Sequence, residues 1–306
     1  MKIVVSGASG LVGAAVARLA AAAGHTVIGL IGTWTGRVPG ATVLQSFDLA
    51  DPARAAHWVA QTRPDAIINA AAFADPASCE KAPELSHSVN VTWPTHLAQA
   101  AIETGARLVH ISSEQVFDGV HAPFAPTSEC HPFNLYGRQK LESEQAILAI
   151  APGSIVVRPP LLVGNSLSGH RSLHEKMLEL WAGGGVARLF GDEFRQVCSA
   201  ENLAAVLIEL AERRDLRGPV HWAGADLVSR FELGRRLAEK FHAPAALLTE
   251  VWRSANPAVA AKRPANLALD LAPLDRELRT HPQPLNEAIR GLRVPSSIKW
   301  PPAVPS

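Results

Sequence analysis

The sequence contains few of the residues that mark several classes of protein. Its 306 residues include only three cysteines, Cys79, Cys130 and Cys198, and no C-x-x-C pair. This argues against a disulfide framework or a thiolate zinc site and fits a reducing compartment. Because Lys and Arg exceed Asp and Glu by only one (29 against 28), the net charge of +1 gives no electrostatic case for binding nucleic acid or an anionic membrane.

Long apolar runs are also absent. The most apolar helical stretch near the N-terminus is interrupted by Arg18 and His25, which excludes a simple membrane span. Met1 and Lys2 lead directly into a short apolar run, so we expect no signal peptide. With 47% hydrophobic and 19% charged residues, the composition is that of an ordinary globular chain, and we expect a cytoplasmic protein.

A glycine-rich turn follows the first apolar run. Gly7, Gly10 and Gly13 are spaced as G-x-x-G-x-x-G, between Ile3–Val5 and the helix-forming stretch Ala14–Leu19. Strand, glycine turn and helix in this order are typical of a dinucleotide site, because the glycines allow close backbone approach to a pyrophosphate and the helix N-terminus offers free N–H groups. The predicted contacts to the cofactor are Gly7, Ser9, Gly10, Leu11, Val12 and Gly13.

Strand and helix patterns alternate through the first half of the chain. Short apolar runs predict further strands at Thr26–Ile31, Ala41–Gln45, Asp65–Asn69, Leu108–Ile111 and Ser154–Val157, with helices at Asp51–Gln61, Val91–Thr104 and Asn134–Ile150. Such alternation implies right-handed crossovers and a parallel sheet covered on both faces. The expected fold class is α/β, a doubly wound (Rossmann) sheet.

The pattern changes after about residue 160. Helices are expected at Leu173–Trp181, Asn202–Arg213 and Arg230–Phe241, with a strand at Val220–Ala223 and a loosely packed tail at Val294–Ser306. We therefore divide the chain into a dinucleotide-binding domain, 1–160, and a smaller C-terminal α/β substrate domain, 161–306. The boundary is approximate, and segments are allowed to interleave across it.

The only tyrosine of the chain, Tyr136, precedes Lys140 by four residues. At this spacing both side chains lie on one face of a helix. A lysine beside a phenol favours the phenolate, so we expect Lys140 to lower the pKa of Tyr136 and to suit it for proton transfer to or from a carbonyl. Ser113 leaves the carboxyl end of a predicted parallel strand, where ligands of such sheets bind.

Together these features resemble the extended short-chain dehydrogenase/reductase family. The residues that carry the resemblance are the spaced glycines, Asn69–Ala72, Asn90, Ser113, Tyr136 and Lys140. Among the branches of that family the chain is most similar to the dTDP-4-dehydrorhamnose reductases, through Arg63–Ala71, Val89–Val91, Val116–Gly119, Val157–Pro159 and Arg263–Asp270.

The resemblance implies a role for each matching residue. Tyr136 would donate the proton to a substrate carbonyl, Lys140 would lower the pKa of that phenol and hold the nicotinamide ribose, and Ser113 would orient the carbonyl. Asn90 would support the lysine through a water. The further residues expected to line the cofactor are Asp48, Leu49, Ala70, Ala71 and Ala72.

The second predicted strand bears on which nicotinamide is used. NAD-preferring sites usually place an acidic residue at its end, but here it is followed by Gly32–Arg37 without an acid. Thr33 and Arg37 would instead receive a 2′-phosphate. We expect NADPH as the cofactor, with NADH as the second choice.

Two charged residues complete the predicted substrate site. Arg195 matches a position at which extended members often pair an arginine with the substrate's diphosphate, a task that suits a bidentate guanidinium. Glu114 follows Ser113 at a place where dehydratases usually carry an acid. Gln115 and Leu161 replace aromatic residues that are usual in the branch, so the resemblance leaves the sugar open.

The leading hypothesis is an NADPH-dependent reductase of a keto group on a nucleotide-activated deoxysugar. An epimerase or dehydratase with retained cofactor is the first alternative, and the second is a non-enzymatic dinucleotide-binding regulator like the methionine adenosyltransferase regulatory subunit, which resembles the same branch. His170 and His174 have helical spacing, but without a third ligand we expect no metal. A homodimer through the helices beside the sheet is compatible with the family resemblance.

Overall fold

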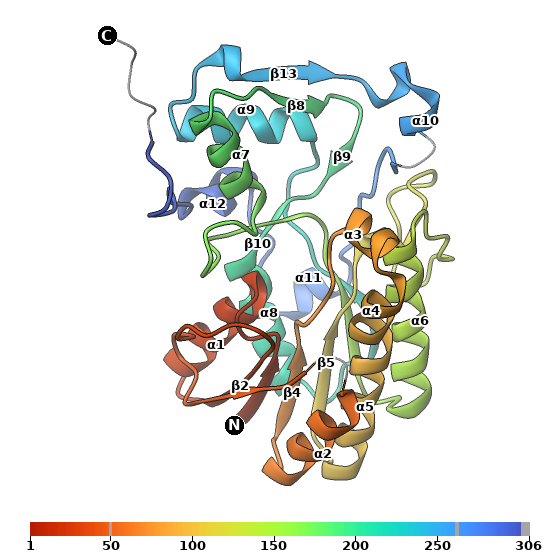
Figure 1. Cartoon of the computed structure of the whole chain (residues 1–306). Coiled ribbons are helices and arrows are strands. Elements are labelled where there is room, and N and C mark those ends of the chain that lie inside the picture. The colour runs from red at the N-terminus through yellow and green to blue at the C-terminus, as the bar shows by residue number, and fades with distance from the viewer. Residues whose placement is uncertain (49–50, 261–262, 301–306) are drawn as a thin grey trace.

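The protein has two parts, one above the other in Figure 1. The computed structural model describes residues 1–48, 51–260 and 263–300. The larger part is built on a seven-stranded parallel sheet with helices on both faces. The smaller part stands over the edge at which the strands of that sheet end. A doubly wound α/β fold with a smaller C-terminal unit is therefore confirmed.

The strand order of the sheet defines where a ligand binds. The order is β3-β2-β1-β4-β5-β6-β11, and every pairing in it is parallel. The direction of winding reverses between β1 and β4, and ligands of open α/β sheets bind outside the carboxyl ends of the strands at such a point. The strands are β1 (Lys2–Ser6), β2 (Thr26–Ile31), β3 (Val43–Ser46), β4 (Ala66–Asn69), β5 (Arg107–Ile111), β6 (Ile155–Arg158) and β11 (Gly218–His221).

Two helical layers cover the sheet. On one face α1 (Leu11–Ala22) packs against α8 (Ala200–Glu212), and their apolar faces enclose Val5, Val16 and Leu207. On the other face α2 (Pro52–Thr62) and α5 (Trp93–Thr104) enclose Val4 and Leu97, with α6 (Leu135–Ile150) beside α5. The strands are buried on both faces, as parallel strands require. No helix in the described part of the chain is long and apolar enough to cross a membrane.

The smaller part has its own apolar core. Its helices and its β8–β13 pair enclose Leu178, Trp181, Leu233 and Leu237. Its elements are β7 (Leu162–Val163), α7 (Leu173–Ala182), β8 (Ala187–Phe190), β9 (Phe194–Arg195), β10 (Cys198–Ser199), β12 (Val228–Ser229), α9 (Arg230–Lys240), β13 (Leu248–Val251), α10 (Pro257–Ala260) and α12 (Leu285–Arg290). The short helix α11 (Leu274–Glu277) lies with the larger part, where Leu274 joins the core beside α8.

The expected tail is wrong for the residues that the structure describes. Val294, Ile298 and Trp300 pack against the core of the smaller part, and the indole Nε1 of Trp300 donates to the carbonyl of Phe241 at 2.7 Å. The prolines of this segment prevent a helix but leave apolar side chains that cover the core. The segment is thus irregular and packed.

Elements from beyond residue 160 complete the larger part. Helix α8 covers one face of the sheet, and β11 pairs with β6 as its last strand. The polypeptide therefore enters the smaller part, returns to the sheet, and leaves again. The division at residue 160 stays a prediction, with segments that interleave across it.

Candidate active site

Ser113 and Tyr136 meet at the carboxyl end of β5. Ser113 caps a short 3-10 turn, Glu114–Val116, by accepting a hydrogen bond from Gln115 N at 3.2 Å. The Ser113 side chain interacts with the phenol of Tyr136 and lowers its pKa, against the larger effect of burial. Both residues are buried, at 6% relative exposure each. The structure thus brings together two of the three predicted catalytic residues.

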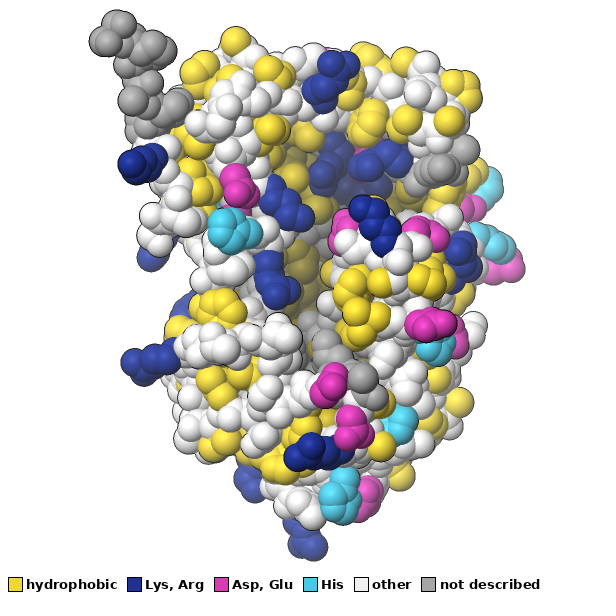
Figure 2. All heavy atoms as spheres, in the orientation of Figure 1, with side chains coloured by type: hydrophobic (Ala, Val, Ile, Leu, Met, Phe, Trp, Pro, Cys, Tyr) yellow, Lys and Arg dark blue, Asp and Glu magenta, His cyan; other side chains and the backbone are white. Residues whose placement is uncertain are grey.

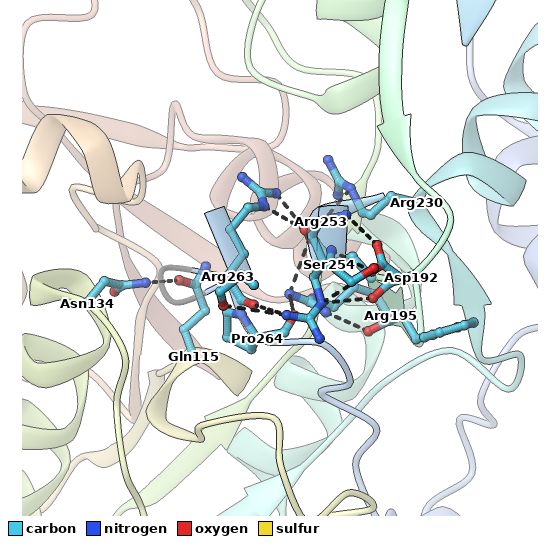
Figure 3. Close-up of polar contacts among 12 residues, drawn as sticks. Gln115, Asn134, Asp192, Arg195, Arg230, Arg253, Ser254, Arg263 and Pro264 are labelled. Atoms are coloured by element: carbon cyan, nitrogen blue, oxygen red, sulfur yellow. Dashed lines mark hydrogen bonds and ion pairs between the residues drawn. The ribbon is translucent and has the colours of Figure 1, made fainter. Parts of the chain in front are cut away.

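The start of α6 fixes the position of Tyr136. Asn134 caps the helix by accepting from Gly137 N at 2.8 Å, and its amide donates to Gln115 Oε1 at 2.8 Å (Figure 3). A Cβ on Gly137 would lie only 2.1 Å from the carbonyl oxygen of Gln115. The glycine lets the helix rest directly on the turn that carries Ser113, so Gln115 has a structural role that the sequence did not indicate.

Lys140 lies on the same helix, and its ammonium group is buried. Its side chain is 1% exposed, and its Nζ makes no hydrogen bond to any described residue. Burial lowers the pKa of the ammonium to about 8, although the nearby Glu144 carboxylate opposes the change. A buried cation without a partner is costly for the fold, so such groups usually serve a ligand.

The expected lowering of the Tyr136 pKa is wrong for the chain alone. Burial raises the pKa of the phenol to about 12, and the interaction with Ser113 offsets only part of the rise. Lys140 is not among the causes, so desolvation outweighs the cation that the sequence spacing suggested. The phenol is therefore protonated at neutral pH, which is the form that can donate a proton.

Asn90 is held by protein groups. It lies in a π-helical turn, Ser88–Thr92, just before α5. Its Oδ1 accepts from Phe73 N at 2.8 Å, and its Nδ2 donates to Gln139 Oε1 at 2.9 Å. Asn90 thereby ties the loop after β4 to the residue next to Lys140, and its predicted contact with a water stays a prediction.

The glycine turn after β1 has the geometry that the sequence predicts. Gly7 adopts φ +74°, and a Cβ there would lie 2.6 Å from Ala71 N, so only glycine lets this turn touch the loop after β4. Gly10 is the N-cap of α1 and provides no side-chain cap, and no acidic residue stands in the first turn. The free N–H groups of this twelve-residue helix therefore face the switch point of the sheet.

The remaining predicted cofactor residues lie in loops, and most of those that the structure describes are exposed. Thr33, Arg37 and Asp48 are exposed in the loops after β2 and β3. Ala70 is half-buried and donates its N–H to Ser6 O at 2.9 Å. Ala72 is exposed. Leu49 lies outside the described residues.

Glu114 and Arg195 join the two parts of the molecule. Arg195 Nε lies 3.0 Å from Glu114 Oε1, and both side chains are buried. Burial raises the pKa of Glu114 to about 7, a rise that the attraction of Arg195 only reduces. Figure 3 shows Arg195 among further arginines, and Figure 2 shows lysine and arginine side chains gathered beside a hollow between the two parts.

A metal site is not formed by the two histidines with helical spacing. His170 lies 3.6 Å from Glu179 on the surface. His174 is buried between Ser172 Oγ and the carbonyl of Arg293. Within residues 1–48, 51–260 and 263–300 no group of three metal-ligating side chains occurs.

Comparison with known families identifies the group to which this architecture belongs. The family described as RmlD substrate binding domain matches residues 1–293. The chain belongs to this family. The resemblance to the extended short-chain dehydrogenase/reductases of the dTDP-4-dehydrorhamnose reductase branch is thereby confirmed.

Relatives of two kinds share the sequence. A dTDP-4-dehydrorhamnose reductase of Mycolicibacterium smegmatis is 32% identical over 240 residues, which cover 78% of this chain and 68% of the relative. The methionine adenosyltransferase 2 subunit beta of Xenopus laevis is 31% identical over 240 residues, covering 76% and 70%. The crystal structure of a hypothetical dTDP-4-dehydrorhamnose reductase from Sulfolobus tokodaii superposes with a TM-score of 0.79 at 30% identity, over 94% of this chain and 98% of that one.

Several residues of the site had no clear signal in the sequence. Gln115, Gln139 and Arg230 act through partners distant in the chain, which local periodicity does not report. Gly137 is the exception, because a glycine inside the first turn of a helix indicates a close contact.

Proposed function

We propose that the protein is an NADPH-dependent reductase of a keto group on a nucleotide-activated deoxysugar, similar to dTDP-4-dehydrorhamnose reductase. The observation that carries the proposal is the buried pair of Ser113 and Tyr136 beside the unpartnered ammonium of Lys140. The two hydroxyls are suited to hydrogen-bond a carbonyl oxygen, and the ammonium is suited to hydrogen-bond the hydroxyls of a ribose. The relatives named as reductases support the substrate class.

The residues present fit a bound nicotinamide dinucleotide. Gly7 and Gly10 with the first turn of α1 would hold the pyrophosphate, and Lys140 would hold ribose hydroxyls with its free Nζ. When bound, the reduced cofactor supplies a hydride to the carbonyl carbon. A Bacillus anthracis dTDP-4-dehydrorhamnose reductase of the same fold is described in complex with NADP.

The protein's own residues then handle the carbonyl oxygen. Ser113 donates a hydrogen bond that orients the carbonyl and stabilises charge on its oxygen. Tyr136, whose pKa of about 12 keeps the phenol protonated, donates the proton. Burial of both hydroxyls excludes water from this step.

The choice of NADPH depends on the loop after β2. No acidic residue follows that strand to accept a bond from the ribose 2′-hydroxyl of NADH. Thr33 and Arg37 are exposed there and free to move toward a 2′-phosphate. We therefore expect NADPH to be preferred and NADH to be used less well.

The relatives named methionine adenosyltransferase 2 subunit beta support a second candidate, a regulatory dinucleotide-binding subunit. A dehydratase or epimerase has less support, because the Glu114 carboxylate that would act on the substrate is bound by Arg195 at 3.0 Å.

The experiment is oxidation of NADPH, followed by its absorbance, with a dTDP-4-keto-6-deoxysugar as substrate. Wild-type protein should consume NADPH, and Tyr136→Phe should reduce the rate by about 10²–10⁴-fold while binding NADPH equally well. Binding of NADPH without oxidation by wild-type protein would instead favour the regulatory subunit. Equal rates for both proteins would refute the role of Tyr136.

A further inference from the structure

A row of buried polar side chains crosses the sheet near the carboxyl ends of its central strands. Ser6, Asn69 and His110 stand in register on β1, β4 and β5, and each is 0% exposed. Strands of a parallel sheet are usually apolar where they are buried on both faces, and buried polar groups need hydrogen-bond partners. The partners of His110 show what this residue does.

The amide of Asn69 has one orientation that satisfies its neighbours. Its Oδ1 accepts a hydrogen bond from Ala71 N at 3.2 Å, so its Nδ2 is the atom that lies 3.0 Å from His110 Nδ1. Because an amide nitrogen can only donate, Nδ1 of the imidazole must be the unprotonated acceptor. A neutral ring then carries its proton on Nε2.

The other side of the ring requires the same tautomer. His110 Nε2 lies 3.3 Å from Ser143 Oγ, and the Ser143 hydroxyl donates its one proton to the carbonyl oxygen of Lys140 at 2.8 Å. The Ser143 oxygen can therefore only accept from the Nε2–H group. Burial and the nearby Lys140 ammonium hold the pKa of His110 well below its usual range, so the ring is neutral at neutral pH.

These hydrogen bonds connect the two halves of the predicted cofactor site. They form the His110 network, whose members are Ala71, Asn69, His110, Ser143 and Lys140. At its first end, Ala71 lies against the glycine turn, where a Cβ on Gly7 would be 2.6 Å from Ala71 N. At its other end, the network fixes the backbone of Lys140, whose Nζ has no hydrogen-bond partner among the described residues.

We propose that His110, as the neutral Nε2–H tautomer, is a positioning residue that holds Lys140 at a fixed distance from the glycine turn. The part that Lys140 plays at the nicotinamide ribose rests on the proposed function, whereas the tautomer rests on the hydrogen bonds of the network. A buried ring that is bound on both sides cannot rotate without losing a hydrogen bond. Lys140 is thus in place before the cofactor arrives, which favours binding and reaction.

Calorimetry on the full chain tests this role with two probes, NADP⁺ and 2′-phosphoadenosine 5′-diphosphate, which lacks the nicotinamide riboside. His110→Asn keeps an acceptor for Asn69 but is too short to reach Ser143. It should bind NADP⁺ about tenfold more weakly than wild type and the second probe within about threefold of wild type. His110→Gln keeps a donor for Ser143, so its affinity for NADP⁺ should stay within about threefold of wild type.

The matched control is His57→Asn, at an exposed histidine on α2 that contacts Gln61, and it should bind both probes as wild type does. Equal loss of both probes in His110→Asn would mean general damage to the fold and would overturn the positioning role. Where His110→Asn does not fold, Ser143→Ala breaks the same link and should weaken NADP⁺ alone. Unchanged NADP⁺ affinity in Ser143→Ala would contradict the proposal.

NMR of the ¹⁵N-labelled imidazoles tests the tautomer without any ligand. The signals missing from either His110 variant identify this ring among the twelve histidines. Nε2 should be protonated and Nδ1 unprotonated throughout the range from about pH 5.5 to 8.5. A proton on Nδ1, or a ring that titrates within that range, would overturn the network.

The positioning role and the proposed function can fail separately. The expected pattern of NADP⁺ binding, without oxidation of NADPH by wild type, would support the role of His110 and refute the reductase. Oxidation of NADPH by wild type, with unchanged NADP⁺ affinity in His110→Asn, would do the reverse. Wild-type protein that binds neither probe would overturn both.

Discussion

Two titratable groups of the predicted site are buried at a cost to the stability of the fold. Lys140 has no hydrogen-bond partner among the described residues, and Glu114 has one carboxylate oxygen without one. The sequence predicted both residues as part of the site. It could not predict their burial, because burial depends on α6, the turn after β5 and the smaller part of the molecule together. The direction of the Tyr136 pKa was missed for the same reason.

Replacing Lys140 should stabilise the ligand-free protein. Lys140→Met removes a buried ammonium without a partner, so urea unfolding should show a gain of about 1–3 kcal/mol, with loss of NADPH oxidation. Because burial lowers the pKa of this group from 10.5 to about 8, the unfolded chain binds more protons between these values. The gain should therefore shrink as pH rises from 8 to 10.5.

Lys81→Met is the control for this comparison, since Lys81 is exposed on the surface. Its unfolding free energy should stay within about 0.5 kcal/mol of wild type. A Lys140→Met protein less stable than wild type at pH 7 would show that the ammonium has a partner in solution.

Glu114 should make stability depend on pH in the opposite way to a carboxylate whose pKa is lowered by folding. Its pKa is raised from 4.5 to about 7, so the folded state binds the proton more tightly than the unfolded state. The stabilising contribution is present below about pH 4.5 and is lost as pH rises through 7. Relative to Glu114→Gln, wild type should lose about 1–3 kcal/mol between pH 5 and 7.5.

Chemical denaturation at several pH values measures this difference. Glu142→Gln, at a carboxylate whose side chain is 54% exposed, should show a far smaller pH dependence. A constant difference between wild type and Glu114→Gln over that range would mean that Glu114 ionises normally.

At the scale of elements, the sequence predicted the strands and helices of the sheet because each has a local pattern. The start of α6 followed from Asn134, and the first turn of α2 from Pro52. The helix α3 (Pro76–Lys81) was missed although Asp75 and Pro76 form a start signal. The two-residue strands of the smaller part had no such pattern, since their pairing is long-range.

The glycine turn allows a test that separates backbone strain from crowding. Gly7 and Gly24 both have positive φ, +74° and +83°, but only Gly7 lies against neighbouring backbone. Gly24→Ala should cost about 1 kcal/mol, the strain of the left-handed backbone. Gly7→Ala should cost about 2–4 kcal/mol and abolish NADP⁺ binding, because the turn must also move away from Ala71.

Thermal unfolding and NADP⁺ titration of both variants provide the measurement. The two alanine variants could instead lose equal amounts of unfolding free energy, with NADP⁺ affinity retained in Gly7→Ala. That result would mean that the close contact of Gly7 with Ala71, in the loop after β4, is not needed for stability or for the cofactor.

At the scale of the molecule, the polypeptide passes between the larger and the smaller part more than once. Helix α8 and strand β11 return to the sheet from beyond residue 160, and Arg195 of the smaller part holds Glu114 of the larger one. Local sequence patterns predict each of these elements and residues, but they do not predict where each one packs in the folded molecule. The sequence division at 160 marks where the pattern changes, and it does not by itself identify a unit that can fold.

The fragment 1–160 tests whether that boundary defines a domain. Without α8 the apolar face of α1 and of β1 is uncovered, and without β11 the strand β6 becomes an edge. The fragment should therefore show no cooperative unfolding transition and no NADP⁺ binding, whereas the full chain should show both. Cooperative unfolding of 1–160 with NADP⁺ affinity near that of the full chain would establish an independent domain, and α8 and β11 would then be accessories to a sheet that is stable without them.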